Sequence, residues 1–267
     1  MSKLIEEKLE TSASIAHEPI KLKTAYDYLN RLSFAINGTS TKTLELLSSD
    51  AICLIGDSTM MNIMLTKIVV HSLMPKKYGG FRNSKVFILD AGNCTDVYQF
   101  VNFMKQYGLN IKKNLRRIMI SRVFTVYQLT HFLKYELFKT VHEYRVNIVV
   151  IPELLSMFLQ KPEIDVHEVE FLIGEVIDVL KMVSNKSKVL LITSLSINNK
   201  SCAYHYKLAK AVLEIFNKSI EIDNNKTNDK FKVLLHEKQG KNYVTVRKYL
   251  SLTAEDMLTV YKMNNNG

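Results

Sequence analysis

The chain has little of what disulfide-bonded, metal-binding or membrane-spanning proteins need. Its three cysteines lie far apart with no Cys-x-x-Cys spacing, which argues for a reducing compartment and against a disulfide framework or a zinc site. The seven histidines show no ligand spacing either, so we expect no metal. No uninterrupted apolar run approaches the roughly 20 residues that cross a bilayer, so we expect no membrane segment.

The opening residues, MSKLIEEKLETSAS, are charged and lack the apolar core of a signal peptide. We therefore expect a cytoplasmic protein, or a nuclear one if the source is eukaryotic. Proline and glycine are few, and 267 residues with 47% hydrophobic content suffice for one large α/β domain with a short extension. We assign residues 1–40 to an N-terminal arm and linker, and residues 41–267 to the core domain. No Gly-x-Ser-x-Gly motif indicates a hydrolase.

Negative charge is scarce relative to positive charge, since the formal net charge is +10. Between Val101 and Arg145 there are nine Lys or Arg and two acidic residues, so this segment carries most of the excess. A basic concentration of this kind favours a polyanionic partner such as nucleic acid. The alternative is a solvated, lysine-rich surface of the kind that many soluble proteins have.

Apolar runs and helical repeats alternate through the middle of the chain. Strands are predicted at 51–55, 85–89, 118–122, 146–151 and 188–193, and helices at 60–73, 97–107, 125–144 and 166–183. This alternation predicts right-handed βαβ units. We expect an α/β fold with a twisted, mainly parallel central sheet flanked by helices.

The two ends of the chain have a different pattern. Short helices predicted at 24–32 and 41–47 flank a brief strand and turn at 34–40. The tail predicts successive strands at 209–216, 231–237 and 242–247, joined by polar turns. We expect these strands to extend the C-terminal edge of the sheet in antiparallel fashion.

Residues 51–70, AICLIGDSTMMNIMLTKIVV, have the strand–loop–helix setting of a phosphate-binding loop. The pattern of such a loop is G-x-x-x-x-G-K-[ST]. Only its first glycine is present, as Gly56. The second glycine falls on Met61, the lysine on Asn62 and the Ser/Thr on Ile63.

Residues 73–129 contain shorter motifs in a fixed order. These are Pro75, Gly79-Gly80, a strand ending at Asp90, a helix ending in Tyr107-Gly108-Leu109, and a strand ending in Ser121-Arg122-Val123-Phe124. Their order and spacing resemble the ATPase core of RecA/RadA-type recombinases, especially the archaeal and eukaryotic branch. The resemblance covers roughly residues 20–260 and implies a RecA-like core.

The tetrapeptide from Leu22 to Ala25 resembles the Phe-x-x-Ala linker of the same family, with Leu in the Phe position. In the family this segment docks into a hydrophobic pocket of the neighbouring subunit and pairs its backbone with that subunit's sheet. The resemblance implies that Leu22 and Ala25 form an oligomer interface with a RecA/RadA-type recombinase or with a second copy. The alternative is an ordinary strand packed against its own core.

The family's ATP chemistry needs groups that this chain lacks. Its Lys falls on Asn62, its Mg²⁺-binding Ser/Thr on Ile63, its Walker B Asp on Pro152, its catalytic Glu on Gly92, and its DNA-coupling Gln on Leu195. Because phosphoryl transfer depends on charge placed around Mg²⁺ and the γ-phosphate, we expect a pseudo-ATPase without catalytic residues or cofactor.

The expected degenerate nucleotide site consists of Gly56, Asp57, Asn62, Ile63, Asp90, Pro152 and Glu153. Asp57 would place a negative charge beside any phosphate. A shifted register would let Glu153 supply an acid.

Two loops contact single-stranded DNA in the family, and they correspond here to about 153–165 and 195–206. The second combines basic and aromatic residues, which suits backbone tracking and base stacking. The alternative is that both loops are degenerate, with their tyrosines packed inward. The candidate DNA-binding residues, from this region and from the basic segment, are Lys112, Lys113, Arg116, Arg117, Arg122, Lys200, Tyr204, Tyr206, Lys207 and Lys210.

Three functions remain open on the sequence. The first is a non-catalytic recombinase paralogue that binds single- or double-stranded DNA or a recombinase filament in homologous recombination and DNA repair. The second is a divergent ATPase that binds nucleotide through backbone amides. The third is a regulatory scaffold that contacts proteins only.

Overall fold

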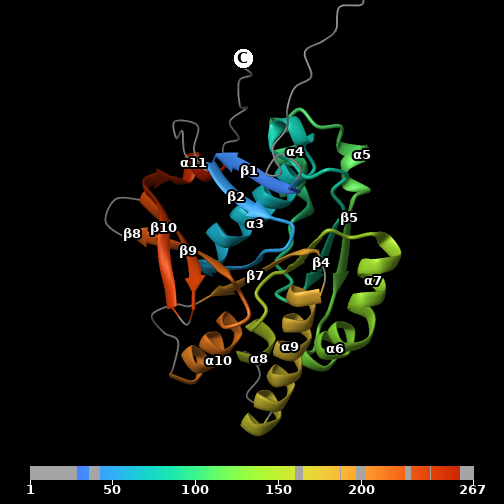
Figure 1. The fold of residues 1–267 in the computed structure, drawn as a ribbon, viewed down its shortest axis with the longest axis vertical. Coiled ribbons are helices and arrows are strands. Elements are labelled where there is room, and N and C mark those ends of the chain that lie inside the picture. Colours follow the sequence, from blue (N-terminus) through green and yellow to red (C-terminus); the bar gives the residue numbers. More distant parts are fainter. Residues whose placement is uncertain are drawn as a thin grey trace, which may run out of the picture.

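The computed structural model describes residues 29–35, 43–159, 165–186, 188–196, 203–225, 230–240 and 242–258. Leu22, Ala25 and Lys200 lie outside these ranges, so the docking linker and part of the second DNA loop stay predictions. Most of the described strands belong to one eight-stranded sheet with helices on both faces (Figure 1).

The strands of this sheet are β3 (Ala51–Gly56), β4 (Val86–Asp90), β5 (Ile118–Arg122), β6 (Ile148–Ile151), β7 (Leu190–Ser196), β8 (Lys218–Asn225), β9 (Lys230–Gln239) and β10 (Asn242–Thr253). Their spatial order is β10-β9-β8-β3-β7-β6-β4-β5. The six strands from β8 to β5 are parallel, and β9 and β10 continue the sheet in antiparallel fashion. The predicted α/β class is confirmed, including the antiparallel strands at the C-terminal edge.

The central strands are apolar because the sheet is covered on both sides. Every residue of β4 and of β6 is buried. Each face of the sheet has its own hydrophobic core, and successive residues of β3 belong to the two cores in turn. Ile52 and Leu54 pack on one face, and Ala51 and Cys53 pack on the other. Near-continuous apolar strands of this kind are typical of parallel sheets sandwiched between helices.

One face of the sheet is covered by α3 (Ser58–Ser72), α4 (Val97–Gln106) and the short α5 (Ile111–Leu115). A separate two-stranded antiparallel sheet, β1 (Arg31–Ala35) and β2 (Thr43–Leu47), packs into the same core. The C-terminal helix α11 (Ala254–Leu258) adds the fully buried Met257 to it.

The opposite face carries a second core under the remaining helices. These are α6 (Val126–His131), the π-helical turn η3 (Phe132–Glu136), α7 (Leu137–Tyr144), α8 (Ser156–Leu159), α9 (Val166–Lys186) and α10 (Ala203–Leu213). The neighbouring strands β3 and β7 therefore send their following helices, α3 and α10, to opposite faces. A divergence of this kind leaves a crevice at the carboxyl ends of the strands, where α/β proteins usually bind ligands. None of the described helices is long and apolar enough to cross a membrane.

Three of the predicted elements are wrong. The helix predicted at 41–47 is strand β2, because Leu44 and Leu46 alternate into the core with a period of two. The helix predicted at 24–32 is wrong over its described part, since Arg31 begins β1. The strand predicted at 209–216 lies largely in α10, whose apolar residues bury against α9 and the sheet. Helix α5, the short 3-10 turn η2 (Lys76–Tyr78) and strand β8 were not predicted.

The C-terminal helix α11 is tied to the body of the fold by hydrogen bonds to its carbonyl groups. Lys67 Nζ, on α3, donates to the carbonyl oxygens of Asp256 at 3.2 Å and Met257 at 3.3 Å. Gln106 Nε2, on α4, donates to the carbonyl of Leu258 at 3.2 Å. The last carbonyls of a helix have no partner within it, so these side chains satisfy them. Burial lowers the pKa of the Lys67 ammonium to about 8.

His71, also on α3, joins three elements at the other end of this face. Its Nε2 lies 3.0 Å from the carbonyl oxygen of Ser33 on β1, and its Nδ1 lies 2.9 Å from the hydroxyl of Tyr107 after α4. A carbonyl only accepts, so Nε2 carries the proton and Nδ1 accepts from Tyr107. Burial lowers the pKa of His71 to about 4, with the Ser33 bond opposing the shift and Lys67 adding to it.

This buried histidine makes the fold sensitive to acid. The unfolded chain binds the proton near pH 6.5, whereas the folded state takes it only near pH 4. The free energy of unfolding should therefore fall by roughly 3 kcal/mol as the pH drops through that window. In urea titrations from pH 7.5 to 4, His71→Asn should be less stable at neutral pH but should have a flatter pH dependence. The exposed His142, mutated to Asn, is the matched control, and equal slopes for all three proteins would contradict the prediction.

Candidate functional site

The residues of the expected nucleotide site meet at the carboxyl edge of the parallel sheet. They lie in the segments that follow β3, β4 and β6, beside the end of β7. The structure therefore brings Gly56, Asp57, Asp90, Pro152 and Glu153 to one edge, although the sequence separates them by almost 100 residues. Asn62 lies on the first turns of α3, and its neighbour Ile63 is buried in the core below.

The N-terminus of α3 is filled by a carboxylate of this chain. Asp57 is the N-cap residue, and its Oδ1 accepts hydrogen bonds from the backbone N–H groups of Thr59 at 3.0 Å and Met60 at 3.2 Å. Helix N-termini bind phosphate through these same N–H groups and through the helix dipole. The place that a phosphate would take is thus already occupied by a negative charge.

Gly56 is explained by packing alone. Its φ is +150°, and a Cβ at this position would clash with the backbone carbonyl of Ile222 on the adjacent β8. Glycine is needed here because two strands approach closely. The one surviving element of the phosphate-loop pattern therefore has a structural cause that does not require a phosphate.

Asn62 and Ile63 do not recreate the missing lysine and hydroxyl. Ile63 is 6% exposed and packs in the first core. Asn62 Oδ1 accepts a hydrogen bond from Cys94 Sγ at 3.4 Å. Burial raises the pKa of Cys94 to about 12, with the charges of Asp90 and Glu153 adding to the shift. The thiol is therefore neutral and serves as a donor within the site.

Asp90 has a structural role, because its carboxylate is held by contacts within the fold. Its side chain is fully buried and accepts from the backbone N–H groups of Cys94 at 3.0 Å and Thr95 at 3.3 Å. Arg122 Nε, at the end of β5, lies 3.3 Å from Asp90 Oδ2. The two backbone contacts hold the loop that follows β4 close to the end of this strand, and Arg122 neutralises the Asp90 carboxylate. Arg122, a candidate DNA contact, also donates to the Thr95 carbonyl at 3.3 Å.

Glu153 fills space that a side chain at position 92 would need. A Cβ built on Gly92 would lie 2.5 Å from Glu153 Cβ and 3.0 Å from its Cγ. Glu153 has a left-handed φ of +50° and is 8% exposed. Its Oε1 accepts from Ser196 Oγ at 2.7 Å, and Ser196 is hydrogen-bonded in turn to Ser58. The structure therefore places the side chain of Glu153, which follows β6, against position 92, which follows β4.

The described residues of the carboxyl edge carry more negative than positive charge. Residues 56–60, 90–97, 122–126, 152–156 and 194–196 contain four acids (Asp57, Asp90, Asp96 and Glu153) and one base, Arg122, which is paired with Asp90. Among the described residues, no group of three or more His, Cys, Asp or Glu side chains could hold a metal ion.

The candidate DNA-binding residues fall into two separate groups. Lys112, Lys113 and Arg116 are exposed on or just after α5. Arg117, beside them, is turned inward, where Nε donates to the Ser84 carbonyl at 2.8 Å and Nη1 to the Leu73 carbonyl at 3.2 Å. Burial lowers the pKa of its guanidinium.

The second group lies on α10, far from α5 (Figure 1). Tyr204 packs partly buried against the second core, while Tyr206 is 48% exposed. Lys207 Nζ pairs with Glu170 Oε1 of α9 at 2.7 Å, and Lys210 is exposed. The two groups therefore cannot form one continuous contact with a short nucleic acid.

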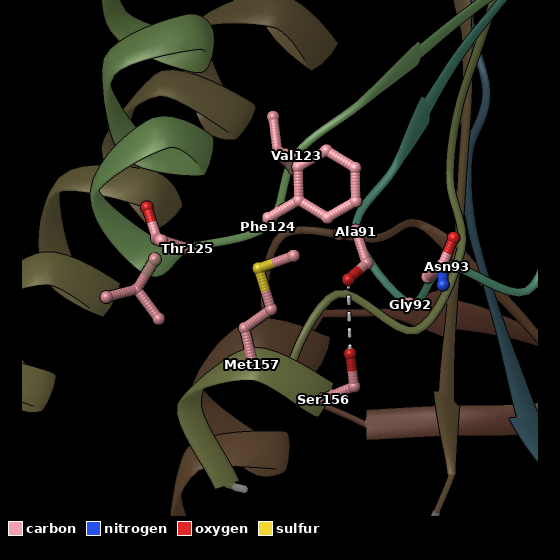
Figure 2. Close-up of a pocket in the computed structure, with 9 residues that line it drawn as sticks. Ala91, Gly92, Asn93, Val123, Phe124, Thr125, Ser156 and Met157 are labelled. Atoms are coloured by element: carbon pink, nitrogen blue, oxygen red, sulfur yellow. Dashed lines mark hydrogen bonds between the residues drawn. The ribbon is translucent and has the colours of Figure 1, made fainter. Parts of the chain in front are cut away.

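Two hollows beside Phe124 were not predicted from the sequence. The first is a pocket of about 170 Å³ whose walls include Phe124, Met157 of α8 and the backbone around Gly92 (Figure 2). The second is a groove of about 520 Å³ between the end of β5 and α6, lined by Phe124, Tyr127 and His131 among others. Phe124 is 66% exposed and Tyr127 is 52% exposed, so two aromatic side chains lie at the surface beside these hollows.

Comparison with known proteins adds no assignment to this geometry. No protein-family model matches the chain, and no curated protein matches it.

The close packing of the Glu153 side chain against Gly92 can be tested by stability measurements. Gly92→Ala should lower the free energy of unfolding by about 1–3 kcal/mol, because its methyl group overlaps the Glu153 side chain. In a Glu153→Gly background the same substitution should cost much less, since the overlap is gone and glycine suits the left-handed backbone at 153.

Gly174→Ala on α9 is the control, because nothing lies within 4 Å of its added Cβ. It should stabilise the protein by about 0.5–1 kcal/mol. Equal costs of Gly92→Ala in both backgrounds, measured by chemical denaturation, would show that Glu153 does not occupy that space.

Proposed function

We propose that this chain is a non-catalytic RecA/RadA-like paralogue, an accessory protein that binds DNA and associates with a recombinase or with itself in homologous recombination and DNA repair. It acts in the cytoplasm, or in the nucleus of a eukaryotic source. The motifs between Pro75 and Phe124 support the family assignment, and the mainly parallel α/β sheet is compatible with it.

The observation that carries the non-catalytic part is the capping of α3 by Asp57. Its carboxylate holds the N–H groups of Thr59 and Met60 that a phosphate would need. Asp90 and Glu153 add negative charge nearby, and the lysine position holds Asn62. A triphosphate would have to displace one carboxylate and sit beside two more, with no cation to compensate.

The association part is supported by the edge strand β5. It pairs only with β4 among the described strands, so its outer backbone groups face no other strand that the structure describes. Ile120 on this strand is 37% exposed, and the aromatic groove of Phe124 and Tyr127 lies at its end. An open strand beside an apolar groove is what strand addition by an extended linker requires.

Nucleotide binding gives the direct test of the non-catalytic role. Isothermal titration of the full chain with ATP and Mg²⁺ should show no binding at micromolar concentrations, and no phosphate should be released with or without DNA. Micromolar affinity would defeat this proposal and favour a divergent ATPase.

Asp57→Asn separates the two effects of that carboxylate. The amide can still cap the helix but removes the charge, so the variant should remain folded and gain at most weak ATP binding. Tight binding by the unmodified chain and no change in the variant would show that Asp57 does not exclude phosphate.

The linker and its receiving edge can be tested from both sides. Leu22→Glu with Ala25→Glu should weaken association with a purified RecA/RadA-type recombinase, or self-association, by about tenfold or more, while leaving the fold intact. Ile120→Lys on β5 should do the same, because charge on an edge strand blocks strand addition. Val244→Lys, on the opposite edge strand β10, is the matched control.

Association can be measured by light scattering and by co-purification. Unchanged association in both the linker and the Ile120 variants would refute the docking proposal, and equal loss in the Val244 control would point to non-specific charge effects.

A further inference from the structure

The amino edge of the parallel sheet collects positive charge from four separate parts of the chain. The segments leading into β4, β5, β6 and β7 are residues 73–85, 105–117, 142–147 and 188–189. Together they contain eleven Lys or Arg and one acidic residue, Glu143. The basic residues among them that are exposed are Lys76, Lys77, Arg82, Lys85, Lys105, Lys112, Lys113, Arg116, Arg145 and Lys188. We call this set the amino-edge patch.

Hydrogen bonds show that the four segments lie side by side. Arg117 donates through Nε to the Ser84 carbonyl at 2.8 Å, which joins the β5 and β4 segments. Lys85 Nζ donates to the Tyr144 carbonyl at 3.0 Å, which joins the β4 and β6 segments. The N–H of Leu190 donates to the Asn147 carbonyl at 3.0 Å, which joins the β6 and β7 segments.

Neighbouring strands lie about 4.8 Å apart, so residues at their amino ends form a closely spaced row. Arg116, Lys85, Arg145 and Lys188 stand in that row, one per strand in the order β5, β4, β6 and β7. Each position is set by a loop whose backbone is hydrogen-bonded to the next. The row is therefore a fixed feature of the fold, unlike a flexible basic tail.

The two edges of the sheet differ in sign. The carboxyl edge has four acids and one paired Arg among its described residues, whereas the four segments before β4, β5, β6 and β7 contain eleven bases and one acid. The segments before β3 and β8 add the acids Asp50 and Glu214, so a polyanion is attracted to the part of the amino edge between β5 and β7. This orientation is the reverse of the usual one in α/β proteins, in which ligands bind at the carboxyl ends of the strands.

We propose that the amino-edge patch binds the phosphate backbone of double-stranded DNA, without base readout. This proposal rests on the DNA-binding part of the proposed function and assigns it to a surface that includes Lys85, Arg145 and Lys188. Lys and Arg on well-ordered loops supply the phosphate contacts of sequence-independent binding. Among the described residues of the four segments, Tyr144 is the one aromatic side chain exposed by more than a third, so stacking of unpaired bases has little support.

The chemistry of the patch favours nucleic acid over a protein or a membrane. Specific protein interfaces have an apolar centre, and the exposed side chains of these segments are mainly charged. Surface-bound membrane proteins insert an amphipathic helix or a lipid chain beside their basic residues. The short α5 is the one helix in these segments that presents basic residues along its length, and its apolar residues pack onto the first core.

The test compares two triple variants with the same net charge of +7. The first, Arg116→Gln, Arg145→Asn and Lys188→Gln, removes exposed charges from the patch, and Asn suits the left-handed backbone at 145. The control, Lys210→Gln, Lys230→Gln and Lys248→Gln, removes exposed charges from α10, β9 and β10. Binding of the full-length proteins to a short fluorescent duplex is measured by anisotropy over a salt series.

The patch variant should bind about tenfold or more weakly, and its slope of log affinity against log salt should become shallower by about 3, one for each lost phosphate contact. The control should keep the affinity and slope of the unmodified chain. Unfolding curves check that both variants remain folded. Two different duplex sequences should bind equally, since no base is read.

Several results would overturn the proposal. Equal losses in the two variants would show that only net charge matters, and a larger loss in the control would place DNA on the α10 side. Absence of duplex binding at low salt, or tighter binding of the patch to anionic lipid vesicles than to DNA, would also reject it. None of these results bears on ATP, so the non-catalytic part of the proposed function stands or falls separately in the titration with ATP and Mg²⁺.

Discussion

The structure depends on one constraint, which is that its parallel strands are buried on both faces. A strand such as β6 has no room for a charged side chain, because one core lies above it and another below. The charged side chains next to these buried parallel strands therefore lie mainly in the segments before and after the strands. The helices and the antiparallel strands carry further charged side chains on their outer faces, such as Lys210 and Lys248.

The carboxyl edge is closed by its own side chains. Asp57 takes the helix N–H groups, Asp90 takes the N–H groups of the β4 loop, and Glu153 takes the space above Gly92. In each case a carboxylate is held by contacts within the chain and stabilises the loop that it belongs to or faces. Under the proposed function, the edge strand β5 and the amino-edge patch are the surfaces that would meet a partner.

Much of the fold could be predicted because apolar periodicity is a local property. The runs at 51–55, 85–89, 118–122 and 146–151 all form strands of the parallel sheet, within one or two residues. The errors arose where a short apolar run fits either period. The segment at 41–47 forms β2, because Leu44 and Leu46 are buried at alternate positions. Most of the segment at 209–216 belongs to helix α10, because its apolar residues pack at helical spacing against α9 and the sheet.

The sequence by itself determined that Asn62 and Pro152 stand where the resemblance would place a lysine and an acid, and that the chain has an excess of positive charge. It could do so because these are statements about residue type at fixed spacing. Only the tertiary structure decided that Glu153 lies over Gly92, and that Lys85, Arg145 and Lys188 share one edge. Those relations join residues far apart in the chain, and they follow from the order in which the strands pair, which no local pattern encodes.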